Sequence, residues 1–171
     1  MTTLRTARLT LRPFTADDAS AVQRLASARE VAYNTLLIPH PYPEGAAAQW
    51  IASHGSDDTH HFAIDDGALV GAMVLKPKAE GIAEIGYWIG VPFWNRGYAS
   101  EAAREVVRFA FEECGMERVF AGHFARNPQS GRVLQKAGMT YEGTLRRHEF
   151  KWGEYVDVAC YGILREEFTG G

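Results

Sequence analysis

The sequence predicts an α/β domain, because segments with strand-like and helix-like patterns alternate along the chain. The alternation is clearest in the middle, where strand, helix, strand and helix patterns cover residues 83–90, 99–114, 118–124 and 128–137. The 171 residues show no internal repeat, low-complexity tract or linker-like change of composition. This length can bury a core without disulfides, so we expect a single domain over residues 1–171.

The first half of the chain predicts three strands and two helices. Residues 8–14 alternate apolar and polar side chains, which indicates a strand, and residues 15–28 have helical spacing with Thr15 as N-cap. Three prolines in residues 33–43 indicate a packed loop. The other elements are a helix at 44–54 and the two strands of a hairpin at 61–64 and 69–75.

The second half contains the two clearest helices. Residues 99–114 place apolar side chains at a period close to 3.6, and Gly115 stands where a helix-ending glycine belongs. Residues 128–137 follow Asn127 as N-cap and end before Gly138. Strands are expected at 140–149 and 155–164. Together with the two helices of the first half, about four helices surround the sheet.

Composition and charge exclude several classes of partner. A net charge of −3 provides no general basic surface for nucleic acid or an anionic membrane. No apolar run approaches the ~20 residues that span a bilayer. Two cysteines give no disulfide framework and the chain starts with polar residues, so we expect a cytoplasmic protein. His60 and His61 lack the accompanying ligands of a metal site, so no metal is expected.

Residues 85–101 predict a phosphate-binding loop. A strand ends, a short turn follows, and a strong helix begins at Gly97, where free backbone N–H groups attract anions. Gly97 and Ala99 leave the backbone accessible, and Arg96 adds a cation. The alternative is a tight turn with a surface arginine. The usual motifs for nucleotide hydrolysis and hydride transfer are absent.

This loop resembles a motif of the GNAT N-acetyltransferases. Residues 94–99, Trp-Asn-Arg-Gly-Tyr-Ala, are similar to the family pattern Q/R-x-x-G-x-G/A, with Trp94 in place of Gln or Arg. That replacement is usual in the branch of the RimJ and RimL ribosomal-protein N-acetyltransferases. The resemblance covers almost the whole chain and includes residues 6–12, 39–42 and 127–139.

The resemblance implies a single-domain GNAT fold and acetyl-CoA as cosubstrate. The fold has a mixed, mostly antiparallel sheet that splays open between two parallel strands, here 83–90 and 118–124. The pantetheine arm would lie in that gap, and the pyrophosphate would lie on the amides of residues 94–99. The implied cofactor-binding residues are Ile89, Val91, Trp94, Asn95, Arg96, Gly97, Tyr98, Ala99, Ser100 and Asn127.

Amine acetylation needs a base for the amine, and Glu84 is the first candidate. Strand alternation puts Glu84 on one face with Gly86 and Trp88, where the glycine leaves room for a ligand. The resemblance implies that a glutamate on this strand acts through water. The alternative is an exposed glutamate at the rim of the sheet. His123, at the end of its strand, is a second candidate base. A third possibility is that neither of these residues is the base.

The departing thiolate needs a donor, and the resemblance implies Ser130 for this role. Leu134 occupies the position where many GNAT enzymes have a tyrosine, so a tyrosine at that position is not available here. The alternative for Ser130 is structural, because it is the third residue of a helix capped by Asn127 and can hydrogen-bond to the cap. Asn127 has both a capping role and an implied contact with pantetheine.

These features predict an N-acetyltransferase that transfers acetyl to a primary amine by direct attack in a ternary complex. The resemblance implies a protein N-terminal α-amine as first acceptor, bound near residues 34–42 and Trp50. The alternatives are an acetyltransferase for a small-molecule amine and a non-catalytic acyl-CoA-binding sensor, which would need neither Glu84 nor Ser130. We expect a monomer or homodimer that binds neither nucleic acid nor membrane.

Overall fold

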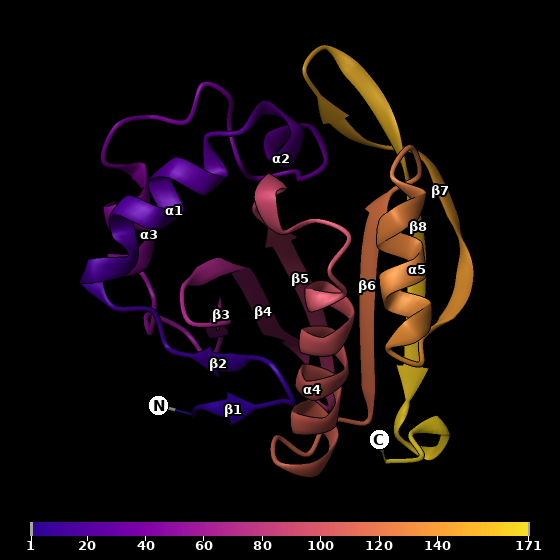
Figure 1. The fold of residues 1–171 in the computed structure, drawn as a ribbon. Coiled ribbons are helices and arrows are strands. Elements are labelled where there is room, and N and C mark those ends of the chain that lie inside the picture. Colours follow the sequence, from indigo (N-terminus) through magenta and orange to yellow (C-terminus); the bar gives the residue numbers. More distant parts are fainter. Residues whose placement is uncertain (1, 171) are drawn as a thin grey trace.

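One eight-stranded sheet organises the computed structural model, which describes residues 2–170 (Figure 1). The strand order is β1-β2-β3-β4-β5-β6-β8-β7. Neighbouring strands are antiparallel except β5 and β6, which are parallel, so the expected mixed and mostly antiparallel sheet is confirmed. The strands are β1 Leu4–Arg5, β2 Thr10–Arg12, β3 His60–Asp65, β4 Leu69–Ala79, β5 Ile82–Ile89, β6 Arg118–Phe124, β7 Thr140–Lys151 and β8 Glu154–Leu164.

The parallel strands β5 and β6 separate after a short paired segment. Their register runs from Ile82 opposite Arg118 to Glu84 opposite Phe120 and stops there. Beyond that point β5 remains paired with β4, and β6 remains paired with β8. The facing edges of β5 and β6 therefore diverge and leave a wedge in the middle of the sheet, as the resemblance implies.

Helices cover both faces of the sheet (Figure 1). Helix α4, Tyr98–Glu112, and helix α5, Pro128–Lys136, lie on one face, and the apolar side of α4 packs into the main core. Helix α1, Ala19–Ala26, and helix α3, Ala46–Ala52, build a second cluster on the opposite face. Val106 and Val107 of α4 are fully buried, and each contributes roughly 1.5–3 kcal/mol through removal of apolar surface from water.

The N-terminal region departs from the sequence prediction. The helical segment expected over residues 15–28 begins after Thr15, its predicted N-cap, but its first turn, Ala16–Asp18, is a 3₁₀ turn and α1 ends at Ala26. The extended backbone of Ala28 then separates α1 from the short helix α2, Arg29–Tyr33, which was not predicted. The structure therefore has five α-helices among the residues described, where about four were expected. The two-residue strand β1 was also not predicted.

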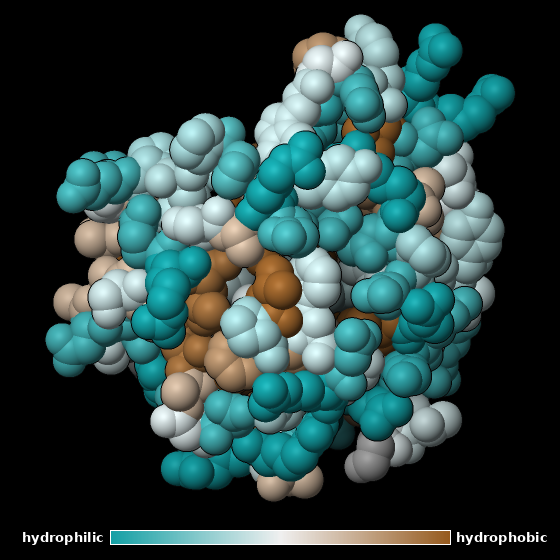
Figure 2. Space-filling view, turned by 45° about the horizontal axis from the view of Figure 1, so that its top comes forward, coloured by the Kyte–Doolittle hydropathy of each residue, from teal (hydrophilic) through white to brown (hydrophobic). Residues whose placement is uncertain are grey.

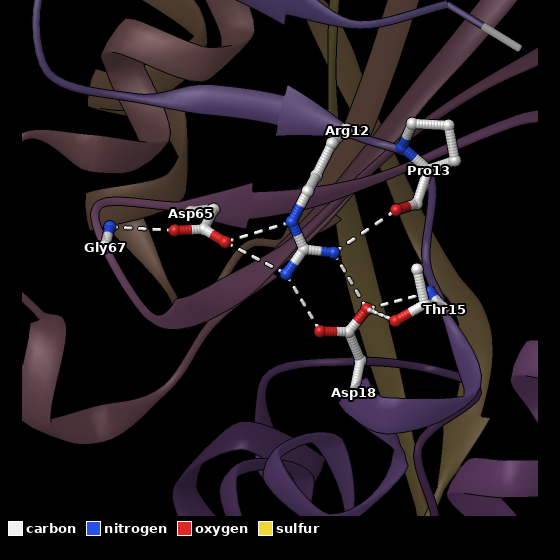
Figure 3. A network of polar contacts seen from close by, with 6 residues as sticks. All are labelled: Arg12, Pro13, Thr15, Asp18, Asp65 and Gly67. Carbon is white, nitrogen blue, oxygen red and sulfur yellow. Dashed lines mark hydrogen bonds and ion pairs between the residues drawn. The ribbon is translucent and has the colours of Figure 1, made fainter.

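A buried ion network fixes this N-terminal region (Figure 3). The Arg12 guanidinium donates to both carboxylate oxygens of Asp18 at 2.8 and 2.9 Å, and its Nε donates to Asp65 at 2.9 Å. Asp18 also accepts a hydrogen bond from the Thr15 amide at 2.8 Å. The network joins β2, the turn before α1 and the end of β3. The local capping contact of Asp18 with Thr15 is thus joined to a long-range one, because Arg12 and Asp65 lie 53 residues apart in sequence.

Candidate active site

The loop before α4 presents free backbone amides. Asn95 and Gly97 adopt left-handed conformations, with φ of 62° and 80°, which turn the chain sharply into the helix. Among the residues that the structure describes, the amides of residues 95–100 have no hydrogen-bond acceptor. The Trp94 amide, expected among the free donors, instead donates to Val91 O at 3.2 Å. The remaining amides at a helix N-terminus form a cradle suited to an anion.

Residues near the start of the chain hold this loop in place through hydrogen bonds. Arg8 donates from Nε to Glu101 at 2.7 Å and from Nη1 to Arg96 O at 3.0 Å, and Thr6 Oγ1 donates to Glu101 at 2.6 Å. Burial acts to raise the pKa of Glu101, but the hydrogen bonds from Thr6 and Arg8 outweigh it and leave the pKa below its usual value. Glu101 is therefore a charged anchor that holds the first turn of α4 and the preceding loop.

Three residues expected at the cofactor direct their side chains to other parts of the protein. The Arg96 guanidinium donates to Pro92 O at 3.2 Å and lies over the Phe93 ring, and the Tyr98 hydroxyl donates to Asp66 at 2.6 Å. The Trp94 indole donates to Ile89 O at 2.7 Å, which takes up one acceptor of the β5 backbone that was expected to pair with pantetheine. These contacts stiffen the loop, so its backbone is left as the binding element.

A smaller cleft of about 340 Å³ lies between this loop, the end of β5 and α5. Eight of the ten residues expected to bind cofactor line it, and Val91 and Arg96 do not. Those eight are Ile89, Trp94, Asn95, Gly97, Tyr98, Ala99, Ser100 and Asn127. Figure 2 shows hydrophobic surface gathered in a hollow on this side of the molecule, with hydrophilic residues around it. A cleft with mixed polar and apolar lining that reaches the free amides fits an extended thioester chain with a phosphate-bearing end.

A larger cleft of about 950 Å³ is built mainly on the α1 and α3 side of the sheet. Its wall is the loop of residues 34–39 together with Tyr42 and Trp50, which the sequence analysis assigns to the acceptor. Its floor is the stripe of Val74, Lys76 and Lys78 on β4 beside Glu84 and Gly86 on β5. His61 lines this cleft and stacks on His54 at 3.8 Å, and burial lowers the pKa of His54 to about 4.

The two clefts meet at the wedge between β5 and β6. Residues that line both clefts are Asn34, Thr35, Tyr87, Trp88 and Ser130. The Tyr87 hydroxyl lies 2.6 Å from Ser130 Oγ and 3.2 Å from Ser130 O. Burial raises the pKa of Tyr87 to about 12, against the opposing effect of the Ser130 hydrogen bond, so the phenol stays protonated at neutral pH. A serine–tyrosine pair therefore stands where molecules in the two clefts would touch.

The structure separates the capping and functional readings of Asn127 and Ser130. Asn127 occupies the N-cap position of α5, but its side chain makes no capping hydrogen bond, so the expected side-chain cap is wrong. Ser130 donates its amide to Asn127 O at 3.2 Å, while its hydroxyl contacts Tyr87 instead of the cap. Both side chains are thus available at the clefts. Tyr87 was missed because its partner lies 43 residues away in sequence.

The candidate bases occupy different places. Glu84 lies on the floor of the larger cleft, in an ion pair with Lys78 at 3.0 Å. His123 also lines this cleft, and its Nδ1 lies 2.8 Å from Phe124 O, while its buried Nε2 has no partner among the described residues. Glu149 on β7 is a further carboxylate at the larger cleft, and no ion pair involves it within residues 2–170. Sequence patterns gave no signal for Glu149, because only the tertiary fold brings β7 to this cleft.

These features define a class of protein. An anion cradle at a helix start, a narrow channel through a splayed sheet and a second cleft that meets it are the parts of an enzyme that transfers an acyl group from coenzyme A. Among residues 2–170 no group of three or more histidine, cysteine, aspartate and glutamate side chains is placed to hold a metal ion. No helix in the described part of the chain is long and apolar enough to cross a membrane.

Comparisons with known proteins identify the family. Residues 8–140 match the acetyltransferase (GNAT) domain, so the chain belongs to the GNAT acetyltransferases and is an acyl-CoA-dependent N-acetyltransferase. It is 32% identical to the uncharacterized N-acetyltransferase YnaD of Bacillus subtilis, over 97% of this chain and 99% of that one. It is 28% identical to the L-amino acid N-acetyltransferase AaaT of Escherichia coli, over 82% of this chain and 88% of AaaT.

Solved structures agree with this family. A GNAT-family acetyltransferase from Bacillus anthracis superposes with a TM-score of 0.88 at 28% identity, over 96% of this chain and 99% of that one. The ribosomal L7/L12 α-N-protein acetyltransferase RimL, solved in complex with coenzyme A, superposes with a TM-score of 0.86 at 17% identity, over 95% of this chain and 98% of RimL. The expected GNAT fold is thereby confirmed.

Proposed function

We propose that this enzyme transfers acetyl from acetyl-CoA to a primary amine by direct attack, with both substrates bound at once. The observation that carries the proposal is the junction of the two clefts at Tyr87 and Ser130. One substrate enters from each side of the sheet, so the reacting atoms are held together without a covalent enzyme intermediate. Such positioning is worth several kcal/mol of the barrier. No cysteine or other activated nucleophile lines the junction among the described residues.

The free amides of residues 95–100 hold the diphosphate, and the Asn127 side chain contacts the pantetheine arm. Acetyl-CoA supplies the acetyl group as a thioester, whose carbon–sulfur bond breaks as the amine nitrogen bonds to the carbonyl carbon. The electron pair of the broken bond goes to sulfur, and the amine loses a proton, which leaves an amide and a free thiol as products. A group on the enzyme must therefore stabilise negative charge on sulfur and another must accept the amine proton.

Ser130 is the group that faces the sulfur, and Tyr87 orients it. Full proton transfer from Tyr87 is unfavourable, because its pKa of about 12 lies well above the value of about 8.5 for an ordinary thiol. A gap of about 3.5 units corresponds to roughly 5 kcal/mol. The pair therefore stabilises the thiolate through a hydrogen bond from the Ser130 hydroxyl, with Tyr87 held as a neutral partner, instead of acting as a strong acid.

Glu84 accepts the amine proton through water in this proposal. Its carboxylate lies on the floor of the larger cleft, and the Lys78 ammonium at 3.0 Å keeps it oriented toward that cleft. Gly86, two residues along the same face, has no atom within 4 Å of the point where a Cβ would lie, which leaves space for a water and an amine. Glu149 and His123 are two further groups at this cleft that could accept a proton.

The acceptor in the proposal is the α-amine of a protein or peptide N-terminus. The larger cleft is wide and its wall includes the exposed Leu36 and Leu37, which an extended chain would cover. The likeness to RimL in fold is consistent with such an acceptor, and the relationship to AaaT supports a second candidate, the α-amine of a free amino acid. Both candidates share an α-amine as the reacting group.

Thiol release from acetyl-CoA tests the proposed function directly. The purified protein is incubated with acetyl-CoA together with one amine at a time. The amines are a tetrapeptide carrying a free α-amine, free L-amino acids and spermidine. Turnover that needs an α-amine supports the proposal, and mass spectrometry of the product locates the acetyl group. Binding of acetyl-CoA with no amine-dependent thiol release would instead favour the non-catalytic sensor, and release with spermidine alone would make the acceptor a polyamine.

Replacing Ser130 with alanine is expected to lower kcat about 100-fold, the usual effect of removing one donor to a developing anion. Tyr87→Phe should lower kcat by about tenfold or less, because it removes one neutral hydrogen bond worth roughly 0.5–1.5 kcal/mol. The double variant should lose no more than Ser130→Ala alone, since the tyrosine acts through the serine. Steady-state kinetics measures all three. Fully additive losses would show that the two residues act independently.

Glu84→Gln is expected to lower kcat/KM about 100-fold, because the variant keeps the size of the side chain without its proton acceptor. Glu149→Gln serves as the matched control and should keep most of the turnover. The KM for acetyl-CoA should stay constant in both variants, since neither residue lines the smaller cleft. The reverse result, with activity lost only in Glu149→Gln, would move the role of base to Glu149.

A further inference from the structure

The tip of the β7–β8 hairpin, residues 150–155, reaches across to the wall of the larger cleft. Figure 1 shows the hairpin extending beyond the sheet at the end where α2 lies. Lys151 is only 7% exposed, and its ammonium donates to Ile38 O at 2.8 Å and to Leu36 O at 3.1 Å. These acceptors lie 113 and 115 residues earlier in the sequence. A side chain near the end of the chain therefore holds the backbone of the 34–39 loop.

The 34–39 loop is part of the proposed active site. All six of its residues line the larger cleft, and Asn34 and Thr35 also line the smaller one. Within the loop, few other hydrogen bonds fix the backbone: Asn34 and Thr35 continue the turn of α2, while the carbonyls of Leu36 and Ile38 are taken by Lys151. The position of the loop, and with it the shape of the wall, depends on this contact.

The ammonium of Lys151 is buried without a carboxylate within ion-pair distance in the described residues. Burying a charge is costly unless hydrogen bonds compensate it, and here the two loop carbonyls provide them. Burial lowers the pKa of Lys151, and the nearby charge of Arg126 adds to this effect. Such a side chain contributes little net stability, so its contact with the loop is the consequence that matters.

Trp152 provides an independent observation at the same tip. It adopts a left-handed conformation with φ of 53°, which a residue of its type rarely does, next to Gly153 with φ of 81°. Its ring lies 5.8 Å from Tyr33 and 5.1 Å from the Arg29 guanidinium, both on α2. The turn therefore keeps a tryptophan where asparagine or glycine would be less strained, and the ring contacts the helix that leads into the 34–39 loop.

Arg126 ties the same helix end to the sheet. Its guanidinium stacks 3.7 Å above the Tyr33 ring and donates to Tyr33 O at 2.8 Å. Nη1 of the same guanidinium pairs with Glu154 of the hairpin tip at 3.5 Å. The loop is thus held at its start by Tyr33 and in its middle by Lys151, and both anchors involve the hairpin tip.

We propose that Lys151 is a positioning residue for the acceptor, because its ammonium holds the 34–39 loop in the place that the amine requires. The inference rests on the proposed function, because it assigns the larger cleft to the amine. Lys151 lines neither cleft itself. It sets the wall against which the acceptor lies, and sequence changes at the tip would change acceptor preference without altering the cofactor channel.

Lys151→Met tests this proposal, with Lys151→Arg as the conservative control. The amine is the member of the panel above that the unaltered enzyme acetylates fastest. Lys151→Met should raise the KM for that amine about tenfold, equivalent to about 1.4 kcal/mol, and leave the KM for acetyl-CoA and acceptor-free hydrolysis within about twofold. Lys151→Arg should keep the KM for the amine close to that of the unaltered enzyme. An unchanged amine KM, or equal rises in both KM values, would overturn the proposal.

Hydrogen exchange separates this result from a failure of the proposed function. Amides of residues 34–39 should exchange faster in Lys151→Met, while those of α4 keep their protection, whether or not any amine is turned over. Trp152→Asn is the second variant, because asparagine suits the left-handed backbone and the turn should still form. It should speed exchange in the loop as well, to a smaller extent. Unchanged loop exchange in both variants would show that the tip does not hold the loop.

Discussion

Replacing Gly97 with valine is expected to abolish measurable acetyl-CoA binding. Gly97 has φ of 80°, and an added Cβ would lie 3.4 Å from Arg8 Nη2, so the branched side chain strains the loop and displaces the Arg8 side chain. Hydrogen bonds to charged groups contribute roughly 1.5–3 kcal/mol each. Loss of two amide contacts to the diphosphate would therefore weaken binding about 100-fold or more. Calorimetric titration with acetyl-CoA measures the effect.

The control for this experiment is Gly115→Val, at the other end of α4. Gly115 has a similar φ of 68° and open space around its Cβ position, so the substitution imposes comparable backbone strain far from the cradle. Both variants should lose similar thermal stability, and only Gly97→Val should lose the stabilisation that saturating acetyl-CoA gives, about 2.7 kcal/mol at 100 times Kd. Equal affinity in the two variants would show that the loop amides do not bind the cofactor.

These two glycines belong to the parts of the fold that local patterns in the sequence can predict. Strand β6 was predicted with the bounds that the structure shows, Arg118–Phe124, and α4 within two residues at each end. Their signals are local, such as the apolar period of α4 and the glycines at its two ends, Gly97 and Gly115. The phosphate loop belongs to the same group, because its strand, turn, glycine and helix are consecutive in the sequence.

Features that depend on distant residues were not predicted. The hydrogen bond of Arg12 to Asp65 spans 53 residues, and no local pattern in residues 15–28 indicates it. The Tyr87–Ser130 pair and the contact of Lys151 with the 34–39 loop span 43 and more than 100 residues. In each case both residues carry ordinary local signals, and only the closed sheet brings them together. The chemistry of the site lies mostly in such pairs.

The acceptor side illustrates the same division. Three prolines indicate the loop that holds its candidate residues, and the resemblance leads us to expect the acceptor there, but the hairpin that contacts this loop comes from the last part of the chain. In the proposed function the free amides that hold the diphosphate come from one continuous segment, residues 95–100, whereas the larger cleft is lined by residues from several separate segments. A single segment is easier to recognise in a sequence, which is why the reaction could be predicted and the acceptor remains a proposal.

Arg12→Met is expected to cause the largest loss of stability. The Asp18 side chain is 9% exposed and the Asp65 side chain 21%, so removing the guanidinium leaves two largely buried carboxylates without their cation. Breaking a buried pair in this way costs about 3–5 kcal/mol. Because Arg12 itself is 27% exposed, we expect the lower end of that range, about 3 kcal/mol. Urea unfolding at pH 7 measures it, and Tm should fall by about 6–12 °C.

The pH dependence of this loss follows from Asp18. The hydrogen bond from Arg12 holds the pKa of Asp18 below its ordinary value of 3.8, against the effect of burial. An acid with a lowered pKa in the folded state contributes stability above its unfolded pKa, and that contribution disappears as the pH falls through the folded value. The difference between the unaltered protein and Arg12→Met should therefore be constant from pH 7 to about 5 and shrink below about pH 4.

Arg165→Met is the matched control, because Arg165 also pairs with a carboxylate, Glu117, at 2.9 Å, but both side chains are exposed. An exposed pair contributes about 0–1 kcal/mol, so this variant should unfold almost as the unaltered protein does at every pH. If Arg12→Met lost as little as Arg165→Met, the network of Figure 3 would behave as a surface feature. If it lost about 3 kcal/mol with the stated pH dependence, one partly buried ion network would account for much of the stability of the N-terminal region.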